Sequence, residues 1–290
     1  MGLPEPPELG AAALPKGTFE GQAVVVTGGG TGLGKAIAVE FARLGAAVAV
    51  LSRDPAHRAA GVAAVEAAGG RALEAACDIR QPEQIAAAFE RVVAELGLPS
   101  TLVNNAAGNF PVPAEDLSPN GWRSVVDIVL NGSFLCAREF ARRHIDAGTP
   151  GCILNVGASY AWTGGPGFAH SAAAKAGVKN MTETLAVEWA PYGIRVNYLV
   201  PGLMPHADEA KHIVEGVPER GQQEDRRAPA GRVGRPRELG WAATFLASPY
   251  AAYITGCTLA VDGANWQRRA MLMPEFTPIR EQLGKGPFRP

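Results

Sequence analysis

In the stretch Val24-Val-Val-Thr-Gly-Gly-Gly-Thr-Gly-Leu-Gly-Lys35, three valines lead into a cluster of glycines. The residues that follow are apolar at helical spacing, so the pattern predicts a buried strand, a tight turn and a helix. Glycine backbone can come close to a bulky anion, and the start of a helix offers N–H groups and a positive dipole end. A glycine cluster by itself also fits a plain loop. Its place after a buried strand favours the pyrophosphate-binding turn of a doubly wound α/β fold.

The composition indicates a packed α/β domain. The chain has 290 residues, of which 47% are hydrophobic and 19% charged, and one doubly wound domain can take up most of this length. The net charge of −1 gives no electrostatic basis for binding nucleic acid or an anionic membrane. No apolar run approaches the roughly 20 residues that cross a bilayer, and the N-terminal residues do not resemble a signal peptide. We therefore expect a cytoplasmic protein.

The four cysteines, Cys77, Cys136, Cys152 and Cys257, lie far apart and without the spacing of metal ligands. We expect reduced, mostly buried thiols and no metal site. Residues 1–17 are rich in Pro, Ala and Gly and predict a flexible arm. One domain then covers residues 18–263, with a polar lid at about 203–235, and residues 264–290 form an extension. After the first strand, we expect strands at 46–52, 72–77, 101–105, 153–156, 194–200 and 258–261, and helices at 56–68, 84–96, 121–145, 171–189 and 237–247.

The second strand ends in Ser52-Arg53, where this fold meets the adenosine ribose of a dinucleotide. A carboxylate there would accept from the ribose 2′-hydroxyl, whereas an arginine would pair with a 2′-phosphate. Ser52 and Arg53 therefore favour NADPH over NADH. The alternative is that Arg53 is a solvated surface charge and Asp54 binds the ribose. Asp78, at the end of the third strand, is placed to accept from the adenine amino group.

The chain resembles the short-chain dehydrogenase/reductase superfamily. The resemblance rests on Thr27–Gly34, Asn104-Asn-Ala-Ala-Gly108, Asn131, Lys175 and Pro201-Gly202, and covers residues 20–263. It implies a single Rossmann-like domain with about seven parallel strands, helices on both faces of the sheet, a nicotinamide cofactor and a homo-oligomer, usually a tetramer. The implied cofactor contacts are Thr27, Gly28, Gly30, Thr31, Gly32, Leu33, Ser52, Arg53, Asp78, Ile79, Asn105, Ala106, Lys175, Pro201, Gly202, Leu203 and Met204.

The chain departs from the superfamily at the catalytic tyrosine. Most members carry this Tyr four residues before the lysine, with a Ser thirteen residues before the Tyr, and the chain has Ser171 and Ala158 there. Fatty-acid enoyl reductases carry a Tyr seven residues before the lysine, where this chain has Phe168. The candidate that remains is Tyr160, fifteen residues ahead of Lys175 and directly after the fifth strand.

The displaced tyrosine resembles the 2,4-dienoyl-CoA reductase branch, as do Asn105–Phe110, Leu117–Asn120, Asp127–Gly132, Ser159–Ala161 and Ser171–Lys175. The resemblance implies that Tyr160 is the acid, that Asn109 joins it on the thioester carbonyl and that Ser171 is a further polar group. It also implies that Lys175 holds the nicotinamide ribose. Arg80 would contact the CoA part of the substrate, and Phe110 and Ser118 the acyl chain. In the predicted lid, Lys211, Arg220, Arg226, Arg227 and Arg232 are further candidates for the CoA phosphates, and the alternative for each of them is a solvated charge on a surface loop.

These residue types suit the reduction of a conjugated thioester. Hydride addition at the far carbon of a dienoyl-CoA moves charge onto the carbonyl oxygen, where a phenol and an amide N–H can stabilise it. An ammonium near the phenol would lower the phenol's pKa from about 10. The expected product is a 3-enoyl-CoA, in an auxiliary step of unsaturated fatty acid β-oxidation. Three alternatives stay open: a reductase of another conjugated carbonyl or a ketone, a non-catalytic NADP-binding module, and a Tyr160 that only caps the fifth strand with its hydroxyl in solvent.

Overall fold

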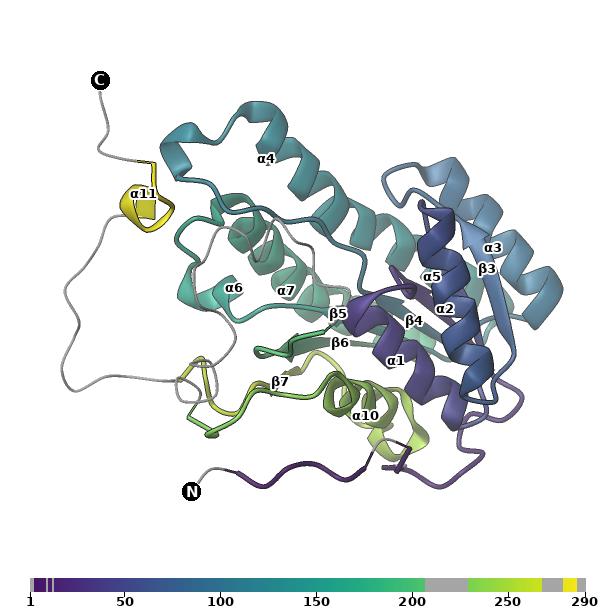
Figure 1. Cartoon of the computed structure of the whole chain (residues 1–290). Helices are drawn as coiled ribbons and strands as arrows, with labels where there is room; N and C mark the ends of the chain where they lie inside the picture. The colour runs from purple at the N-terminus through teal and green to yellow at the C-terminus, as the bar shows by residue number, and fades with distance from the viewer. Residues whose placement is uncertain (1–2, 9, 12, 207–228, 268–278, 286–290) are drawn as a thin grey trace.

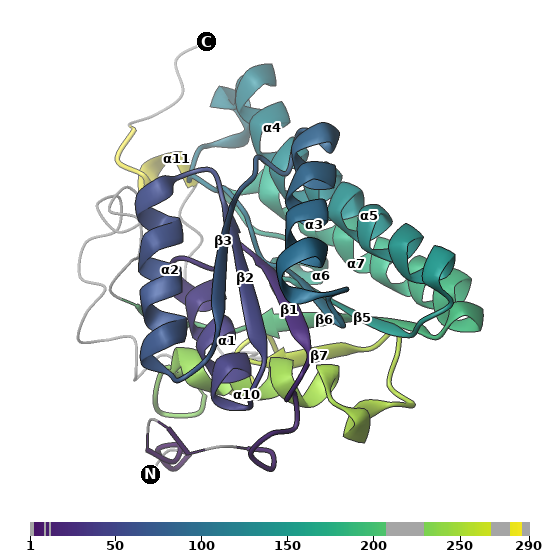
Figure 2. The same ribbon diagram turned by 90° about the vertical axis from the view of Figure 1, so that its right-hand side faces the viewer.

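The computed structural model describes residues 3–8, 10–11, 13–206, 229–267 and 279–285. Its centre is a seven-stranded parallel sheet in the order β3-β2-β1-β4-β5-β6-β7 (Figures 1 and 2). The strands are β1 (Ala23–Thr27), β2 (Ala47–Ser52), β3 (Ala72–Ala76), β4 (Thr101–Asn104), β5 (Gly151–Val156), β6 (Ile194–Pro201) and β7 (Thr258–Val261). The predicted single Rossmann-like domain is confirmed.

Helices cover both faces of the sheet, and this explains why β1, β4 and β5 are buried along nearly their whole length. Apolar residues of α1 (Gly32–Arg43), α2 (Pro55–Ala67) and α10 (Pro236–Ala247) form one core with the first face (Figure 2). Those of α3 (Pro82–Leu96), α5 (Gly132–Ala147) and α7 (Ala169–Trp189) form a second core on the other. The order of the strands reverses between β1 and β4, which is where such sheets bind a dinucleotide at the carboxyl ends of the strands.

The helix predicted at 121–145 is interrupted in the structure. It consists of α4 (Pro119–Val126), a π-helical turn at Asp127–Asn131, and α5. Within the turn, Asn131 Nδ2 donates to Asp127 Oδ1 at 2.8 Å. A π-turn inserts one residue into a helix and often marks a functional site, and this one lies in the segment whose Val129 packs with Tyr198 and Val200 of β6.

Both ends of the chain contact the domain. Leu3 N donates to Ala230 O at 2.6 Å, and Glu5 pairs with Arg235 at 3.1 Å. The short helix α11 (Ile279–Gln282) lies beside the 3₁₀ turn Ala114–Asp116 that precedes α4 (Figure 1). Most of the predicted lid, residues 207–228, lies outside the described residues, and so do its Lys211, Arg220, Arg226 and Arg227.

All four cysteines are free thiols, and Cys77, Cys136 and Cys152 are buried. Burial raises the pKa of the Cys77 and Cys152 thiols to about 11 and that of Cys136 well above its usual value. Across the described ranges, no helix is long and apolar enough to cross a membrane. The same residues contain no group of three or more His, Cys, Asp or Glu side chains that could hold a metal ion.

Candidate active site

A cavity of about 390 Å³ opens at the carboxyl ends of β1 to β4. Ten of the residues expected to bind the cofactor line it: Gly28, Thr31, Gly32, Leu33, Ser52, Arg53, Asp78, Ile79, Asn105 and Ala106. His57, Ala107, Ile128 and His206 also line it and were not predicted. His57 has no motif of its own, and its position in the first turn of α2 is the only signal that could have found it.

The glycines of the β1–α1 turn have different roles. Gly28 and Gly32 adopt positive φ angles of 63° and 51°, which other residues rarely adopt. A Cβ on Gly34 would lie 2.4 Å from Gly28 O and 2.3 Å from Asn105 Nδ2. A Cβ on Gly30 would lie 1.9 Å from His57 O, so Gly30 lets α2 approach the turn and does not line the cavity.

The cavity fits a dinucleotide. The side chain of Thr31, the N-cap of α1, makes no capping hydrogen bond, so no side chain from that residue competes for the helix start where a pyrophosphate would bind. Gly28 and Gly32, which line the cavity at this helix start, carry no side chain. The residues present therefore suit the cofactor that the fold implies.

The adenosine end of the cavity has Arg53 at its rim, with 59% of its side chain exposed. Asp54 does not line the cavity. Its Oδ1 accepts from Ala56 N at 2.8 Å and from His57 N at 3.4 Å, which caps α2. Arg58, a residue that sequence analysis missed, donates from Nη1 to Ser52 O at 3.0 Å and to Arg53 O at 2.8 Å. It thereby holds the turn that presents Arg53.

Asp78 and Arg80 form an ion pair at the same end of the cavity. Arg80 Nε donates to Asp78 Oδ1 at 2.9 Å and Nη2 to Oδ2 at 2.5 Å. This hydrogen bonding lowers the pKa of the Asp78 carboxyl. Arg53 lies 3.9 Å from the same carboxylate. The structure thus places Arg80 with the residues expected to bind adenosine.

Asn104, the last residue of β4, and Asn105, which follows it, bridge neighbouring strands. Asn104 Nδ2 donates to Asn155 Oδ1 of β5 at 2.9 Å. Asn105 Nδ2 donates to Thr27 O at 3.1 Å and to Gly28 O at 3.2 Å. Thr27 Oγ1 in turn accepts from Asn105 N and from Ala106 N, both at 3.0 Å. Thr27 is buried and acts by fixing the floor of the cavity.

Tyr160 begins the short helix α6 (Tyr160–Thr163), which packs on α7. Its hydroxyl lies 3.0 Å from Ser171 Oγ, so the interpretation of a tyrosine with a solvated hydroxyl is wrong. Burial raises the pKa of the Tyr160 phenol, and the hydrogen bond with Ser171 opposes this shift. The expectation of a phenol pKa lowered by Lys175 is therefore also wrong, because desolvation outweighs every favourable contact.

Lys175 is buried, and its Nζ donates to Val156 O at 2.5 Å. Burial lowers the pKa of this ammonium to about 8. Tyr198 of β6, which sequence analysis missed, is also fully buried. Its hydroxyl donates to Lys175 O at 3.0 Å and accepts from Ala158 N at 3.3 Å. A Cβ on Gly157 would lie 2.1 Å from the Tyr198 ring, so this glycine makes room for the tyrosine that ties α7 to the loop before Tyr160.

The loop after β4 meets the loop that carries Tyr160. Val112 N donates to Gly167 O at 2.9 Å. The Phe110 ring packs edge-on against buried His170, with centroids 4.6 Å apart. Asn109 Oδ1 accepts from Phe110 N at 3.0 Å, and its NH₂ group has no protein partner within the described part of the chain. The expected substrate and catalytic residues of the two loops therefore lie in contacting segments.

Two further groups of predicted residues have structural roles. Ser118 is the N-cap of α4, and its Oγ accepts from Gly121 N at 3.0 Å. Gly202 N donates to Val261 O at 2.9 Å, Met204 is buried against Gly234, and Leu203 is partly exposed. Pro201 ends β6. The structure places Pro201–Met204 at the carboxyl end of β6, outside the cavity at β1 to β4.

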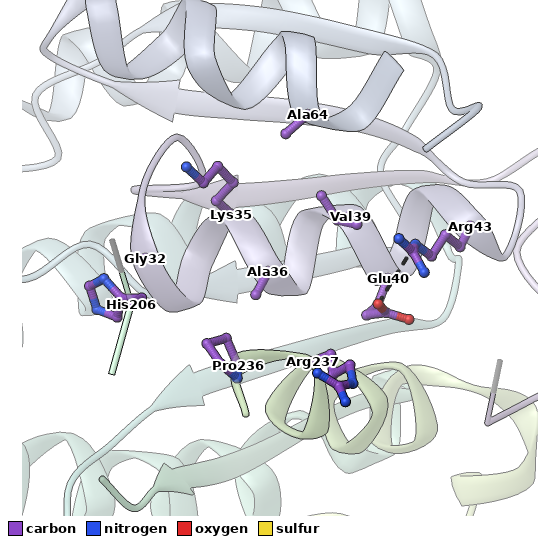
Figure 3. Close-up of a pocket in the computed structure, with 10 residues that line it drawn as sticks. All are labelled: Gly32, Lys35, Ala36, Val39, Glu40, Arg43, Ala64, His206, Pro236 and Arg237. Carbon is purple, nitrogen blue, oxygen red and sulfur yellow. Dashed lines mark ion pairs between the residues drawn. The ribbon is translucent and has the colours of Figure 1, made fainter. Parts of the chain in front are cut away.

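A groove of about 380 Å³ runs along α1 from the cofactor cavity (Figure 3). Gly32 and His206 line both spaces. Lys35 and Val39 of α1, Ala64 of α2, and Pro236 and Arg237 of α10 line the groove. At its far end Glu40 and Arg43 form an ion pair at 3.8 Å. Burial raises the pKa of the Glu40 carboxyl.

Comparison with known proteins agrees with this geometry. Residues 28–264 match the family model described as Enoyl-(Acyl carrier protein) reductase. A probable 2,4-dienoyl-CoA reductase, (2E)-enoyl-CoA-producing, from Bacillus subtilis is 41% identical over 86% of this chain and 98% of its own length. The probable 2,4-dienoyl-CoA reductase decr-1.2, (3E)-enoyl-CoA-producing, from Caenorhabditis elegans is 37% identical over 87% of this chain and 82% of its own length.

Solved structures give the same result. The crystal structure of a short chain dehydrogenase from Bacillus anthracis is 42% identical, with a TM-score of 0.77, and the match covers 85% of this chain and 97% of that one. A citronellol catabolism dehydrogenase from Pseudomonas aeruginosa is 36% identical, with the same TM-score, over 88% of this chain and 99% of that one. By its matched family model, its relatives and its fold, the chain belongs to the short-chain dehydrogenase/reductase superfamily.

Proposed function

We propose that the chain is an NADPH-dependent reductase of 2,4-dienoyl-CoA thioesters that yields 3-enoyl-CoA, an auxiliary step in the β-oxidation of unsaturated fatty acids. The observation that carries the proposal is the 3.0 Å contact between the hydroxyls of Tyr160 and Ser171. Ser171 stands where most of the superfamily has its tyrosine, so the phenol reaches that point from a different loop. The names of the relatives from Bacillus subtilis and Caenorhabditis elegans support the same substrate class.

The protein residues stabilise charge on the substrate. A nicotinamide cofactor bound at the cavity lined by Gly28, Leu33 and Asn105 would supply a hydride to the far carbon of the diene, and negative charge would then develop on the thioester oxygen. The Tyr160 phenol is protonated at neutral pH, and burial raises its pKa further. It therefore donates a hydrogen bond to the oxygen, with the Asn109 amide as a second donor. One such donor is typically worth about 2.7–4 kcal/mol of barrier. Transfer of the Tyr160 proton to the α-carbon completes the 3-enoyl product, and the phenolate regains a proton from solvent.

NADPH is favoured by the turn after β2. Arg53 lines the cavity beside Ser52, and Asp54 is engaged in capping α2. An arginine in this place pairs with a 2′-phosphate. Arg53→Ala should raise the KM for NADPH far more than the KM for NADH in steady-state assays. Equal effects on the two cofactors would remove Arg53 from the 2′-phosphate site.

The test of the activity is loss of NADPH absorbance with 2,4-hexadienoyl-CoA, crotonyl-CoA and a simple ketone. We expect turnover with the diene, and Tyr160→Phe should lower kcat by about a hundredfold or more with little change in NADPH affinity. Tyr192→Phe, at an exposed tyrosine, is the matched control. Activity on the ketone alone would favour a carbonyl reductase, and cofactor binding without any turnover would favour a non-catalytic module.

The product isomer needs its own measurement, because the names of the two relatives differ in the isomer that they state. Reduction in D₂O places deuterium on the α-carbon if the product is the 3-enoyl thioester, and on the γ-carbon if it is the 2-enoyl thioester. Proton NMR of the product distinguishes them. We expect the α-carbon label, and a γ-carbon label would overturn the 3-enoyl product.

A further inference from the structure

The C-terminal extension contacts the domain near the loops that carry Asn109 and Tyr160, and the proposed reaction gives it no role. One of its two described parts, residues 279–285, lies on the 3₁₀ turn Ala114–Asp116, more than 160 residues away in sequence. Arg280 Nη2 donates to Asp116 Oδ1 at 2.9 Å and to Oδ2 at 3.0 Å, and Arg280 Nε lies 3.6 Å from Glu115 Oε1. Lys285 Nζ donates to Asp116 Oδ2 at 3.2 Å. We name residues 279–285 the C-terminal latch.

These ion pairs are partly shielded from water. The side chain of Arg280 is 18% exposed and that of Asp116 is 27% exposed. Exposed single ion pairs contribute little to stability, whereas a network with a two-pronged arginine contact holds its geometry better. The latch therefore has a defined place on the turn.

The latch also contacts the loop that follows Tyr160. A Cβ on Gly167 would lie 3.3 Å from both Cδ1 and Cγ1 of Ile279, so the isoleucine side chain covers this glycine. Gly167 O is the acceptor for Val112 N. Ile279 and Arg280 thus hold, from outside, the two loops that already meet at the Val112–Gly167 hydrogen bond.

A second contact joins the start of the extension to the same region. Trp266 packs edge-on against Trp162 of α6, with ring centroids 5.3 Å apart. Trp162, Ala161 and Phe110 pack against the apolar cluster around Tyr198 and Val178. The two described parts of the extension therefore lie on either side of an apolar region next to the Tyr160 hydroxyl.

We propose that the C-terminal latch holds these two loops together on the acyl side of the substrate, with Arg280 as a positioning residue that acts through Asp116. The inference rests on the proposed reduction of dienoyl-CoA thioesters. In this proposal the acyl tail leaves Tyr160 along the apolar side chains of Phe110 and Trp162, so the binding of tails longer than the conjugated diene depends on the latch. Binding of the cofactor, which would lie at the carboxyl ends of β1 to β4, does not depend on the latch.

A double-mutant cycle tests the pair. Arg280→Gln and Asp116→Asn should each raise the KM for 2,4-decadienoyl-CoA by roughly three- to tenfold, and the double variant should be no worse than the single ones. The KM for NADPH and the kcat with 2,4-hexadienoyl-CoA should stay unchanged. Arg280→Lys should recover part of the loss. Arg91→Gln, which breaks an exposed pair with Glu95 on α3, is the matched control.

A readout without substrate separates the latch from the reaction. Hydrogen exchange measured by mass spectrometry should rise in the peptides that cover 105–118 and 160–168 for Arg280→Gln, and not for Arg91→Gln. If the wild type turns over no dienoyl thioester, the proposed reaction is refuted. Raised hydrogen exchange in Arg280→Gln would still support the contact of the latch with the two loops. Unchanged exchange, additive effects on KM, or an equal rise of KM for the short and long thioesters would each overturn the inference.

Discussion

Single side chains in this site are controlled mainly by burial. Burial raises the pKa of the Tyr160 phenol, so this group stays a neutral hydrogen-bond donor to a higher pH than an exposed tyrosine would. Lys175 shows the opposite effect for a cation, since burial lowers its pKa to about 8. Its ammonium is thus close to losing its proton under ordinary conditions. The two groups respond differently to pH although they lie on neighbouring elements.

The lowered pKa of Lys175 predicts a pH dependence. Below about pH 8 the folded protein carries the buried ammonium, and between about 8 and the usual 10.5 only the unfolded chain does. The contribution of this group to folding stability therefore rises with pH across that window and is lost as pH falls through about 8. Affinity for NADP should fall above about pH 8, because the neutral amine is the weaker donor to the ribose.

Titration calorimetry over a pH series measures this affinity. Lys175→Met should bind NADP more weakly and with a flat profile around pH 8. Lys179→Met, at a partly exposed lysine of α7 that pairs with Glu183, should keep the wild-type profile. A wild-type profile in Lys175→Met would show that another group titrates.

Some site residues could be predicted from the sequence and others could not. Tyr160 was predicted because it is the tyrosine that follows the fifth strand, and Ser171 because it replaces the expected one. Tyr198 could not be predicted, since its hydroxyl forms hydrogen bonds with the backbone of Lys175 and Ala158. Only the folded chain brings these residues together. Arg58 was missed for the same reason, because its partners are the backbone carbonyls of Ser52 and Arg53.

Helix α2 packs closely against Gly30 of the glycine turn between β1 and α1. Gly30 and Gly61 meet where this helix passes the glycine turn, and a Cβ on Gly61 would lie 2.9 Å from Gly30 Cα. The turn therefore holds its shape through α2 as well as through its own dihedral angles. This contact couples packing on one face of the sheet to the mouth of the cofactor cavity.

We predict that Gly30→Ala destabilises the protein by about 1–3 kcal/mol and weakens NADP binding, because His57 O leaves no room for a methyl group. Urea denaturation and cofactor titration measure the two effects. Gly69→Ala is the control, since Gly69 has a φ of 85° and nothing within 4 Å of its missing Cβ. It should cost about 1 kcal/mol from backbone strain and leave NADP affinity unchanged. If Gly30→Ala matched Gly69→Ala in both measurements, the steric argument would be wrong.

The apolar pattern of the sequence predicted the bounds of helices and strands, except where a contact with a distant segment changes the local structure. The strands agree with prediction to within two residues, because buried parallel strands are short apolar runs. The helix predicted at 121–145 hides a π-turn. At this place Ser133 Oγ donates to Val129 O and Asn104 Nδ2 donates to Ser133 O. The second of these hydrogen bonds is donated by Asn104 of β4, and the spacing of apolar residues cannot predict it.

At the scale of the whole molecule, helices α5 and α7 leave apolar side chains on the surface. Phe134 of α5 is 42% exposed and Val187 of α7 is 77% exposed. We propose that these helices form a contact between copies of the chain in a homo-oligomer. A monomer would keep both side chains in water, whereas an assembly would bury them.

Light scattering coupled to size exclusion measures the mass in solution. The wild type should have a multiple of the 30.2 kDa chain mass, and Phe134→Lys should shift the distribution toward smaller species. Glu66→Lys, at an exposed position of α2, changes the charge without touching α5 or α7 and should leave the mass unchanged. A monomeric wild type would contradict the proposal.

The contacts of the chain ends lay beyond sequence reasoning. Glu5 meets Arg235 and Arg280 meets Asp116, and each pair joins segments whose charges look like ordinary solvated residues in the sequence. The central sheet could be predicted because its motifs are local in the sequence. The long-range ion pairs could not be predicted, since any charged residue could have been the partner.

The low reactivity of the native thiols makes it practical to label an introduced cysteine and to measure motion of the protein. Thiolates are the reactive form, and burial keeps Cys77, Cys136 and Cys152 protonated at neutral pH. The partly buried Cys257 also has a raised pKa. Glu281→Cys, at an exposed point of the C-terminal latch, should therefore take up a maleimide fluorophore ahead of the native thiols. Single-molecule spectroscopy could then follow the latch during turnover without first rebuilding the interior of the protein.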